Sequence, residues 1–118
     1  LIEFGNRIAE IAGDKESVCR YGGDEFLLFL MGYNEDDTRS ICNTLVKKMR
    51  EPFNIAGNEF YLSASVGAAL MPKDANDIDN LLIKADSALY VSKNNGRDQF
   101  NFYKEGMAND SKNMDNDF

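Results

Sequence analysis

The segment Arg20-Tyr21-Gly22-Gly23-Asp24-Glu25-Phe26 runs directly into the apolar string Leu27-Leu28-Phe29-Leu30-Met31. Residues 18–21 and 26–31 are rich in side chains that favour β-strands. Gly22 and Gly23 allow the positive backbone φ angles that a tight turn needs. The pattern therefore predicts a β-hairpin that carries two adjacent carboxylates, Asp24 and Glu25, at its tip.

Two adjacent carboxylates at one turn indicate either a cation site or an ordinary solvated hairpin. Like charges at this spacing raise each other's pKa and lose hydration energy on burial unless a cation lies between them. A hard divalent cation is the natural occupant, because such ions prefer carboxylate oxygens. From the residues of the turn alone, both interpretations are open.

The composition indicates one small domain, or part of one. The chain has 118 residues, of which 43% are hydrophobic, enough for a single modest core. Its 20 acidic and 13 basic residues give a net charge of −7, which argues against broad electrostatic binding to nucleic acid. A ligand that carries phosphate groups would therefore have to be bound by a few local cations.

Cysteine and histidine usage argues against a structural zinc site. The chain has two cysteines, Cys19 and Cys42, without a C-x-x-C pair, and it has no histidine. Reduced cysteines in a cytoplasmic setting are the expectation.

No apolar run approaches the roughly 20 residues of a membrane span and no signal peptide opens the chain, so we expect no direct membrane contact from this segment. A parent protein could still be tethered through another domain.

Helical and strand periodicities predict the elements outside the hairpin. Three helices are expected. The first spans residues 1 to about 12, and the second begins after a cap at Asn34 and ends before Pro52. The third spans about 78–94, with a cap at Asn76 or Asp77. A second hairpin is expected around residues 56–58. Its second arm should continue as one long strand to Leu70, and a last strand should cover 99–103.

Two packing predictions concern the long strand and the third helix. One face of the strand is expected to admit a closely packed neighbour, most simply a helix, because it carries only small residues: Ser63, Ser65, Gly67 and Ala69. The apolar stripe of the third helix is expected at Ile78, Leu82, Ala85 and Leu89.

The order of these elements predicts an α+β or α/β sandwich with a central, mainly antiparallel sheet flanked by helices. We assign residues 1–103 to this domain. Residues 104–118 are polar and acidic, which is typical of a tail or linker.

Three motifs, in this order, resemble the GGDEF family of diguanylate cyclases. The first is Gly22 to Phe26 with Arg20 ahead of it. Residues 62–67 are similar to the family's L-T-x-S-I-G strand. Residues 85–97 are similar to its A-D-x-A-L-Y-x-A-K-x-x-G-R segment, although Ser92 stands where alanine is usual. The chain is identified as a member of the family, covering the C-terminal two-thirds of its domain.

The resemblance implies a nucleotidyl-cyclase-like fold and a bacterial signalling reaction that condenses two GTP molecules into cyclic dimeric GMP, releasing two pyrophosphates. Carboxylate-bound Mg²⁺ or Mn²⁺ would lower the pKa of the attacking 3′-hydroxyl. The reaction implies a homodimer in which each domain presents one GTP. The parent chain would carry a sensor or receiver domain that controls dimerisation.

The resemblance also implies roles for the hairpin residues. Asp24 would be a metal ligand and the proton acceptor, and Glu25 would help to organise the metal or the phosphates. Gly22 and Gly23 would let the backbone approach the nucleotide. Arg20 would orient the hairpin or reach a phosphate.

Lys93 and Arg97 would hold the triphosphate tail, since arginine can engage two oxygens at once. Their position near the end of the third helix has an alternative interpretation, because basic side chains commonly complement the negative end of a helix dipole.

The sequence departs from the family in two respects. Family members carry a D-x-D-x-F-K-x-x-N-D type strand and helix ahead of the helix that opens this chain at Leu1. We therefore expect a fragment that lacks this N-terminal strand and helix, exposes a sheet edge and is nearly inactive alone. The family's inhibitory R-x-x-D motif is replaced by Gly13-Asp14-Lys15-Glu16, so we predict no inhibitory site.

Two other functions are compatible with the chain. One is a non-catalytic, GTP-binding GGDEF-like module that regulates an attached domain such as a phosphodiesterase, against which the intact motif of residues 22–26 argues. The other is a nucleotidyl cyclase that acts on a single ATP or GTP, which the specificity of the motif disfavours.

Overall fold

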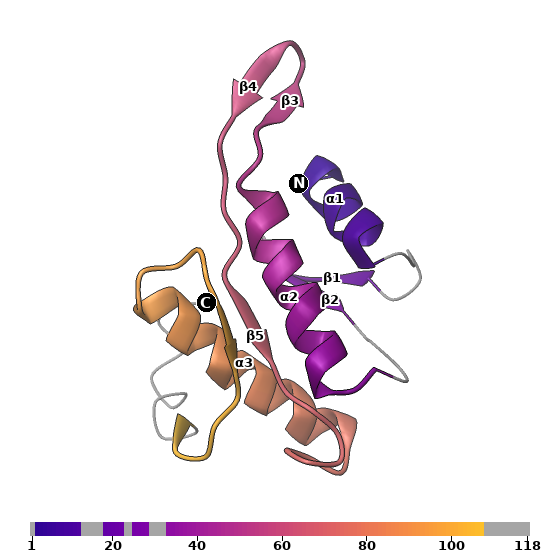
Figure 1. Ribbon diagram of the computed structural model, residues 1–118, viewed down its shortest axis with the longest axis vertical. Coiled ribbons are helices and arrows are strands. Elements are labelled where there is room, and N and C mark those ends of the chain that lie inside the picture. Colours follow the sequence, from indigo (N-terminus) through magenta and orange to yellow (C-terminus); the bar gives the residue numbers. More distant parts are fainter. Residues whose placement is uncertain (1, 13–17, 23–24, 29–32, 108–118) are drawn as a thin grey trace. The chain divides into compact units, whose positions relative to one another are not determined.

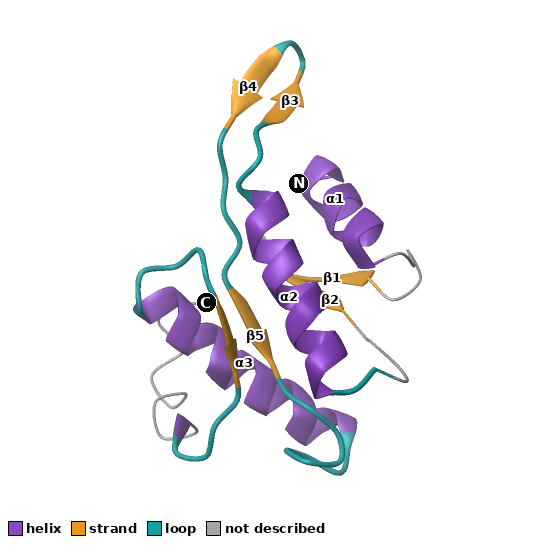
Figure 2. Ribbon diagram, in the orientation of Figure 1, coloured by secondary structure: helices purple, strands orange, loops and turns teal. Residues whose placement is uncertain are grey.

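The computed structural model describes residues 2–12, 18–22, 25–28 and 33–107, and for residues 2, 4, 12, 18–22 and 25–28 only the backbone (Figure 1). Its contacts divide the chain into two compact units, Leu1–Leu62 and Ser63–Phe118, and each unit is described by itself. Helices and short strands alternate in both units (Figure 2). The predicted α+β class is therefore confirmed.

The first unit contains two helices and two hairpins. Its elements are α1 (Ile2–Ala12), β1 (Val18–Gly22), β2 (Glu25–Leu28), α2 (Glu35–Met49), β3 (Phe53–Ile55) and β4 (Asn58–Phe60). Helix α1 packs against α2 and contacts β1. The two predicted helices and the two predicted hairpins of this unit are confirmed.

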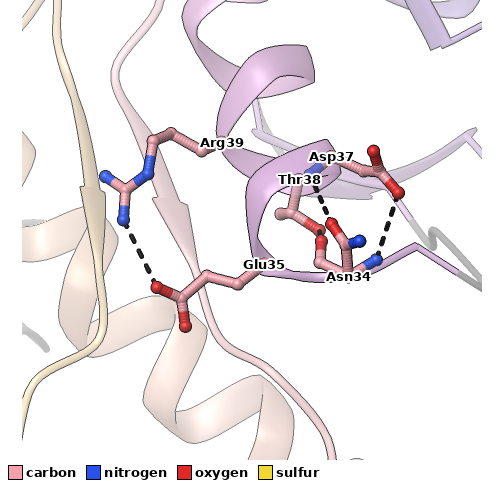
Figure 3. Close-up of polar contacts among 5 residues, drawn as sticks. All are labelled: Asn34, Glu35, Asp37, Thr38 and Arg39. Carbon is pink, nitrogen blue, oxygen red and sulfur yellow. Dashed lines mark hydrogen bonds and ion pairs between the residues drawn. The ribbon is translucent and has the colours of Figure 1, made fainter.

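Asn34 caps α2, as predicted, and does so through a capping box (Figure 3). The side-chain oxygen of Asn34 accepts from the backbone N–H of Asp37 at 2.7 Å, and the Asp37 carboxylate accepts from the Asn34 N–H at 3.4 Å. The Thr38 hydroxyl donates to the Asn34 carbonyl at 2.9 Å. Two backbone donors that would otherwise lack partners are satisfied, which stabilises the first turn by roughly 1 kcal/mol.

The core of the first unit lies between α1, α2 and β3. Large and small apolar side chains are buried here: Ile8, Ala9, Cys42, Leu45, Val46, Met49 and Phe53. Burial of each large apolar side chain contributes roughly 1.5–3 kcal/mol to the stability of the fold. The buried face of α2 is formed by Thr38, Cys42, Leu45, Val46 and Met49.

Arg7 links α1 to the end of α2, a role that helical spacing alone did not indicate. Its guanidinium donates to the carbonyl oxygens of Lys48 (3.3 Å), Glu51 (2.5 Å) and Pro52 (2.9 Å). It also lies over the Phe53 ring, 3.4 Å from the centroid. Arg7 therefore bonds one carbonyl of the last turn of α2 and two carbonyls of the segment that follows it.

The hairpin of β3 and β4 is joined by Ala56 and Gly57, whose φ angles are 53° and 82°. Positive φ at both central residues is typical of the type I′ turn, which matches the twist of the strands. The predicted continuation of β4 to Leu70 is wrong. The ladder ends at Phe60, and the next strand, β5 (Val66–Ala68), begins after an interval that belongs to no described strand.

The second unit is built from β5, α3 (Ile78–Asn94) and β6 (Phe100–Phe102). The two strands are parallel, with Val66 opposite Phe100 and Ala68 opposite Phe102. This parallel pair differs from the expected antiparallel majority. Its cause is the connection: α3 carries the chain back along the sheet, so the second strand runs in the same direction as the first.

Gly67 allows α3 to approach β5 at backbone distance, as predicted. A Cβ atom added at Gly67 would lie 2.1 Å from the Leu89 nitrogen and 2.6 Å from the Ala85 oxygen. The predicted apolar stripe of α3 is only partly confirmed: Leu82, Ala85 and Leu89 are half-buried and Ile78 is 50% exposed, whereas Ser87, Ala88 and Ser92 are fully buried. A helix this close to a strand buries its smallest side chains, because larger ones do not fit between the backbones.

The described strands form three separate two-stranded sheets. Within the described residues, no helix is both long enough and apolar enough to cross a bilayer. The boundary predicted at residue 103 follows the end of β6, but residues 108–118 lie outside the described residues. The assignment of a tail therefore stays a prediction.

Candidate functional site

Residues 18–22 and 25–28 form the predicted hairpin. Strands β1 and β2 are antiparallel, with Cys19 opposite Leu27, Arg20 opposite Phe26 and Gly22 opposite Glu25. The register shifts between Arg20 and Gly22, which is typical of a β-bulge. Gly22 and Glu25 were expected within the turn, but they are the last residue of β1 and the first of β2. The connection therefore has only two residues, Gly23 and Asp24.

The structure places some of the predicted hairpin residues and not others. Arg20 lies in the ladder, and Gly22 and Glu25 face each other where the ladder ends. Gly23 and Asp24 lie outside the described residues, as does the 13–16 segment that replaces the inhibitory motif. The roles of these residues stay predictions.

The predicted metal site at the hairpin tip rests on its donor chemistry. Asp24 and Glu25 would supply carboxylate oxygens, the ligands that Mg²⁺ and Mn²⁺ prefer. Within the part of the chain that the structure describes, no group of three or more His, Cys, Asp or Glu side chains could hold a metal ion. The side chains of Asp24 and Glu25 lie outside that part.

Lys93 and Arg97 flank the C-terminal end of α3, as predicted. Lys93 is half-buried in the last turn and Arg97 is exposed. The helix ends in a Schellman-type turn, in which the Arg97 N–H donates to the Ser92 carbonyl at 2.9 Å and Gly96 has φ 114°. Both cations therefore project from one short, closed segment of the second unit.

The turn after α3 holds two residues in the left-handed region, Arg97 (φ 62°) and Asp98 (φ 51°). Non-glycine residues seldom adopt this conformation, and surrounding contacts must stabilise it. The Gln99 side-chain amide donates to the carbonyls of Asn95 (3.1 Å) and Arg97 (3.2 Å), and the Asp98 N–H donates to the Ser65 hydroxyl at 3.2 Å. The Arg97 backbone is thus bonded at both its N–H and its carbonyl.

Sequence reasoning missed the role of Ser92, which it treated only as a minor departure from alanine. Ser92 is fully buried, and its hydroxyl donates to the Val66 carbonyl at 2.7 Å. The Asn101 amide donates to the same hydroxyl at 2.8 Å. A signal was present, because a hydroxyl at a position where alanine is usual needs a partner once it is buried.

Cys42 is a core residue on the buried face of α2. The thiol is buried, and burial raises its pKa from 9.0 to about 12. Since the thiolate is the reactive form, this thiol is protected near neutral pH. Asp77, the observed cap of α3, has a pKa below its ordinary value because the Asn80 N–H donates to its carboxylate.

Comparison with known proteins places this geometry in a family. The family described as "Diguanylate cyclase, GGDEF domain" matches residues 1–99. The chain is 36% identical over 107 residues to the bifunctional diguanylate cyclase/cyclic di-GMP phosphodiesterase MucR of Pseudomonas aeruginosa, covering 91% of this chain and 16% of MucR. It is 33% identical over 101 residues to the cyclic di-GMP phosphodiesterase NbdA of the same organism, covering 86% of this chain and 13% of NbdA.

A solved structure supports the same assignment. The chain superposes on the GGDEF domain of PA1120 (YfiN or TpbB) from Pseudomonas aeruginosa with a TM-score of 0.77 and 26% identity, covering 88% of this chain and 66% of that one. The chain therefore spans a small part of the two curated relatives and about two thirds of the solved domain. The match over residues 1–99, together with the shared fold, shows that this chain belongs to the GGDEF domain family.

Proposed function

We propose that this domain is the C-terminal part of a diguanylate cyclase domain, which condenses two GTP molecules into cyclic dimeric GMP. The observation that carries the proposal is the hairpin of β1 and β2, in which Gly22 and Glu25 pair around Gly23 and Asp24 in a chain of the GGDEF family. A two-residue connection directs both acidic positions to one end of the ladder.

The proposed reaction is two in-line phosphoryl transfers. The 3′-hydroxyl oxygen of one GTP bonds to the α-phosphorus of the other, the bond from that phosphorus to the β-phosphate bridging oxygen breaks, and pyrophosphate leaves. Asp24 accepts the proton of the hydroxyl, and the carboxylates of Asp24 and Glu25 would hold the divalent cation. Mg²⁺ or Mn²⁺ would acidify the hydroxyl and neutralise charge on the phosphates when bound.

The proposed phosphate-binding residues lie at the end of α3. Lys93 and Arg97 are four residues apart at the end of α3. The turn there is held by a hydrogen bond from the Arg97 N–H to the Ser92 carbonyl. Arg97 is exposed, so its guanidinium is accessible to a ligand. Cations at the α- to γ-phosphates would stabilise charge on the leaving pyrophosphate.

The proposed active form is a homodimer within a longer, multidomain protein. MucR and NbdA are much longer than this chain, which covers 16% and 13% of them, so a sensor or receiver domain is consistent with these lengths. The 118 residues alone should be nearly inactive. The free, buried Cys42 is consistent with the cytoplasmic setting we propose for the domain.

A second candidate is a GTP-binding module that regulates an attached phosphodiesterase. Its support is the similarity to NbdA, which is named a cyclic di-GMP phosphodiesterase. The two candidates make different predictions: the cyclase forms product from GTP, whereas the module binds GTP and changes the activity of its neighbour.

The deciding experiment is product formation by the native chain that contains these residues, incubated with GTP and Mg²⁺ and followed by chromatography. We expect cyclic dimeric GMP and pyrophosphate, with product lost in Asp24→Ala. Asp36→Ala is the matched control, because Asp36 is an exposed aspartate in the first turn of α2. GTP binding without product, in an otherwise folded protein, would favour the regulatory module instead.

A further inference from the structure

Helix α3 buries two serines completely, and their hydroxyls bond in different directions. Ser87 donates to the Ile83 carbonyl of its own helix at 3.0 Å. Ser92 donates across to the Val66 carbonyl of β5 at 2.7 Å and accepts from the Asn101 amide of β6 at 2.8 Å. The Ser87 hydroxyl therefore bonds only within α3, whereas the Ser92 hydroxyl joins the helix to both strands of the parallel pair.

The bonds of Ser92 continue through side chains to the turn that carries Arg97. The Asn101 amide nitrogen that donates to Ser92 also donates to the Gln99 side-chain oxygen at 3.1 Å. The Gln99 amide nitrogen in turn donates to the carbonyls of Asn95 and Arg97 at 3.1 and 3.2 Å. Val66, Ser92, Asn101, Gln99 and Arg97 thus form one continuous chain of hydrogen bonds.

This chain of bonds acts on a segment that needs support. Arg97 and Asp98 both have positive φ, which costs free energy unless neighbouring contacts stabilise the conformation. The Ser92 carbonyl accepts from the Arg97 N–H, so Ser92 holds the turn by its backbone as well as by its hydroxyl. In the described part of the chain, no buried side-chain nitrogen or oxygen lacks a partner, so the network is complete.

We propose that Ser92, Asn101 and Gln99 are positioning residues that hold the turn of residues 95–98 in the conformation that presents Arg97 to a nucleotide phosphate. This inference rests on the proposed function, which assigns phosphate binding to Arg97. None of the three side chains needs to touch the nucleotide. Their effect passes through the Arg97 backbone, which fixes the direction in which the guanidinium leaves the turn.

The first test compares Ser92→Ala with Ser87→Ala in the native chain that contains this domain. Both variants remove a fully buried hydroxyl from α3, but only Ser92→Ala breaks the network. We expect Ser92→Ala to raise the KM for GTP, or the Kd in the absence of turnover, about three- to ten-fold, the equivalent of one hydrogen bond. Ser87→Ala should leave both constants within about two-fold. Equal constants in the two variants would overturn the inference.

The second test separates positioning from stability with Asn101→Leu and the double variant Ser92→Ala/Asn101→Leu. Removing both partners of a buried hydrogen bond restores much of the stability that either single change loses. Positioning of the turn is not restored, because Gln99 still lacks the Asn101 donor. We expect the melting temperature of the double variant to recover while the KM for GTP stays raised. Recovery of both together would show a purely structural role.

A third measurement distinguishes failure of this inference from failure of the proposed function. Amide hydrogen exchange at Arg97 and Asp98 reports the turn without any nucleotide. We expect exchange at least about five-fold faster in Ser92→Ala than in Ser87→Ala, because the turn loses part of its support. If exchange is unchanged, the inference is wrong even when the protein uses GTP. If the turn loosens but the unaltered protein neither binds nor converts GTP, the proposed function is wrong, and the assignment of Arg97 to phosphate is lost with it.

Discussion

Helices α2 and α3 both end in basic residues, but their last turns are completed in different ways. At the end of α2, a guanidinium from another helix, Arg7, occupies the carbonyls of Lys48, Glu51 and Pro52. At the end of α3, the chain bonds to itself through Gly96 and the Arg97 N–H. A side-chain cation bonds carbonyls at the end of α2, whereas at the end of α3 the bonds come from the backbone and from the neutral amide of Gln99.

The difference bears on the meaning of Lys93 and Arg97. Basic residues near a helix end are often explained by the helix dipole, and Lys47 and Lys48 fit that explanation at α2. At α3 the Schellman-type turn already satisfies carbonyls of the last turn, so exposed Arg97 is not needed as a cap. This contrast favours a ligand-binding role for Arg97 over a purely structural one.

The two helices also differ in how they are buried, and the largest predicted effect follows from that difference. Helix α2 packs through Leu45, Val46 and Met49, whereas α3 meets Gly67 of β5 at backbone distance. Gly67→Ala would place a methyl group 2.1 Å from the Leu89 nitrogen, and backbone cannot give way as a flexible side chain can. We expect a loss of about 3 kcal/mol or more in unfolding free energy, measured by urea denaturation.

Gly57→Ala is the control for that substitution. Gly57 has a positive φ of 82°, but nothing lies within 4 Å of the position its Cβ would take. The cost there should be limited to backbone strain, about 1 kcal/mol. A loss at Gly67 no greater than the loss at Gly57 would contradict the close approach of α3 to β5.

Arg7→Met tests the other half of the comparison. Methionine keeps much of the apolar contact but removes the three bonds to the end of α2 and the cation above the Phe53 ring. We expect a loss of about 2 kcal/mol in unfolding free energy, since hydrogen bonds to a charged group are among the stronger ones. Arg97→Met should change stability by less than about 0.5 kcal/mol. Equal losses would mean that the two helix ends are completed alike.

Gly96→Ala affects the α3 end more gently. The φ of 114° at Gly96 is unfavourable for alanine, so we expect a loss of about 1–2 kcal/mol in stability. The turn that carries Arg97 should shift as well, and the KM for GTP should rise. Gly57→Ala, which strains the turn of the β3–β4 hairpin in the first unit, should lower stability without changing KM. A KM for GTP that is the same in both variants would separate the turn from phosphate binding.

The smallest effect near neutral pH concerns Cys42 in the face of α2. The pKa of its thiol is raised from 9.0 to about 12 by burial, so the folded state holds its proton more tightly than the unfolded state does. The corresponding stability is fully present below about pH 9 and is lost as pH rises from 9 towards 12. In a Cys19→Ser background, alkylation at pH 8 should occur only on unfolding. Rapid alkylation of the folded protein would contradict this.

Much of the fold could be predicted because local signals determined it. The Asn34 cap, the bounds of α3 and the existence of both hairpins depend on residues adjacent in sequence. The parallel pairing of β5 with β6, the early end of β4 and the burial of Ser92 depend on which distant segment lies alongside. Hydrophobic periodicity does not carry that information, and it placed Ile78 in the core.

The candidate site was predicted in the same uneven way. The residue types of the hairpin and of the α3 end were recognisable from motifs. The bond network of Ser92, Asn101 and Gln99 was not, because its members are separated in sequence and meet only when β6 lies beside β5.

The most direct test of the central claim measures kcat and KM for GTP in the native chain with Asp24→Asn and Arg97→Ala, beside Lys47→Ala as the control from the end of α2. For Asp24→Asn we expect a kcat at least about a thousand-fold lower, with KM little changed, because the proton acceptor is lost. For Arg97→Ala we expect a KM raised about ten-fold or more, and for Lys47→Ala no change. A protein that forms no cyclic dimeric GMP, or an Arg97→Ala variant indistinguishable from Lys47→Ala, would contradict the claim.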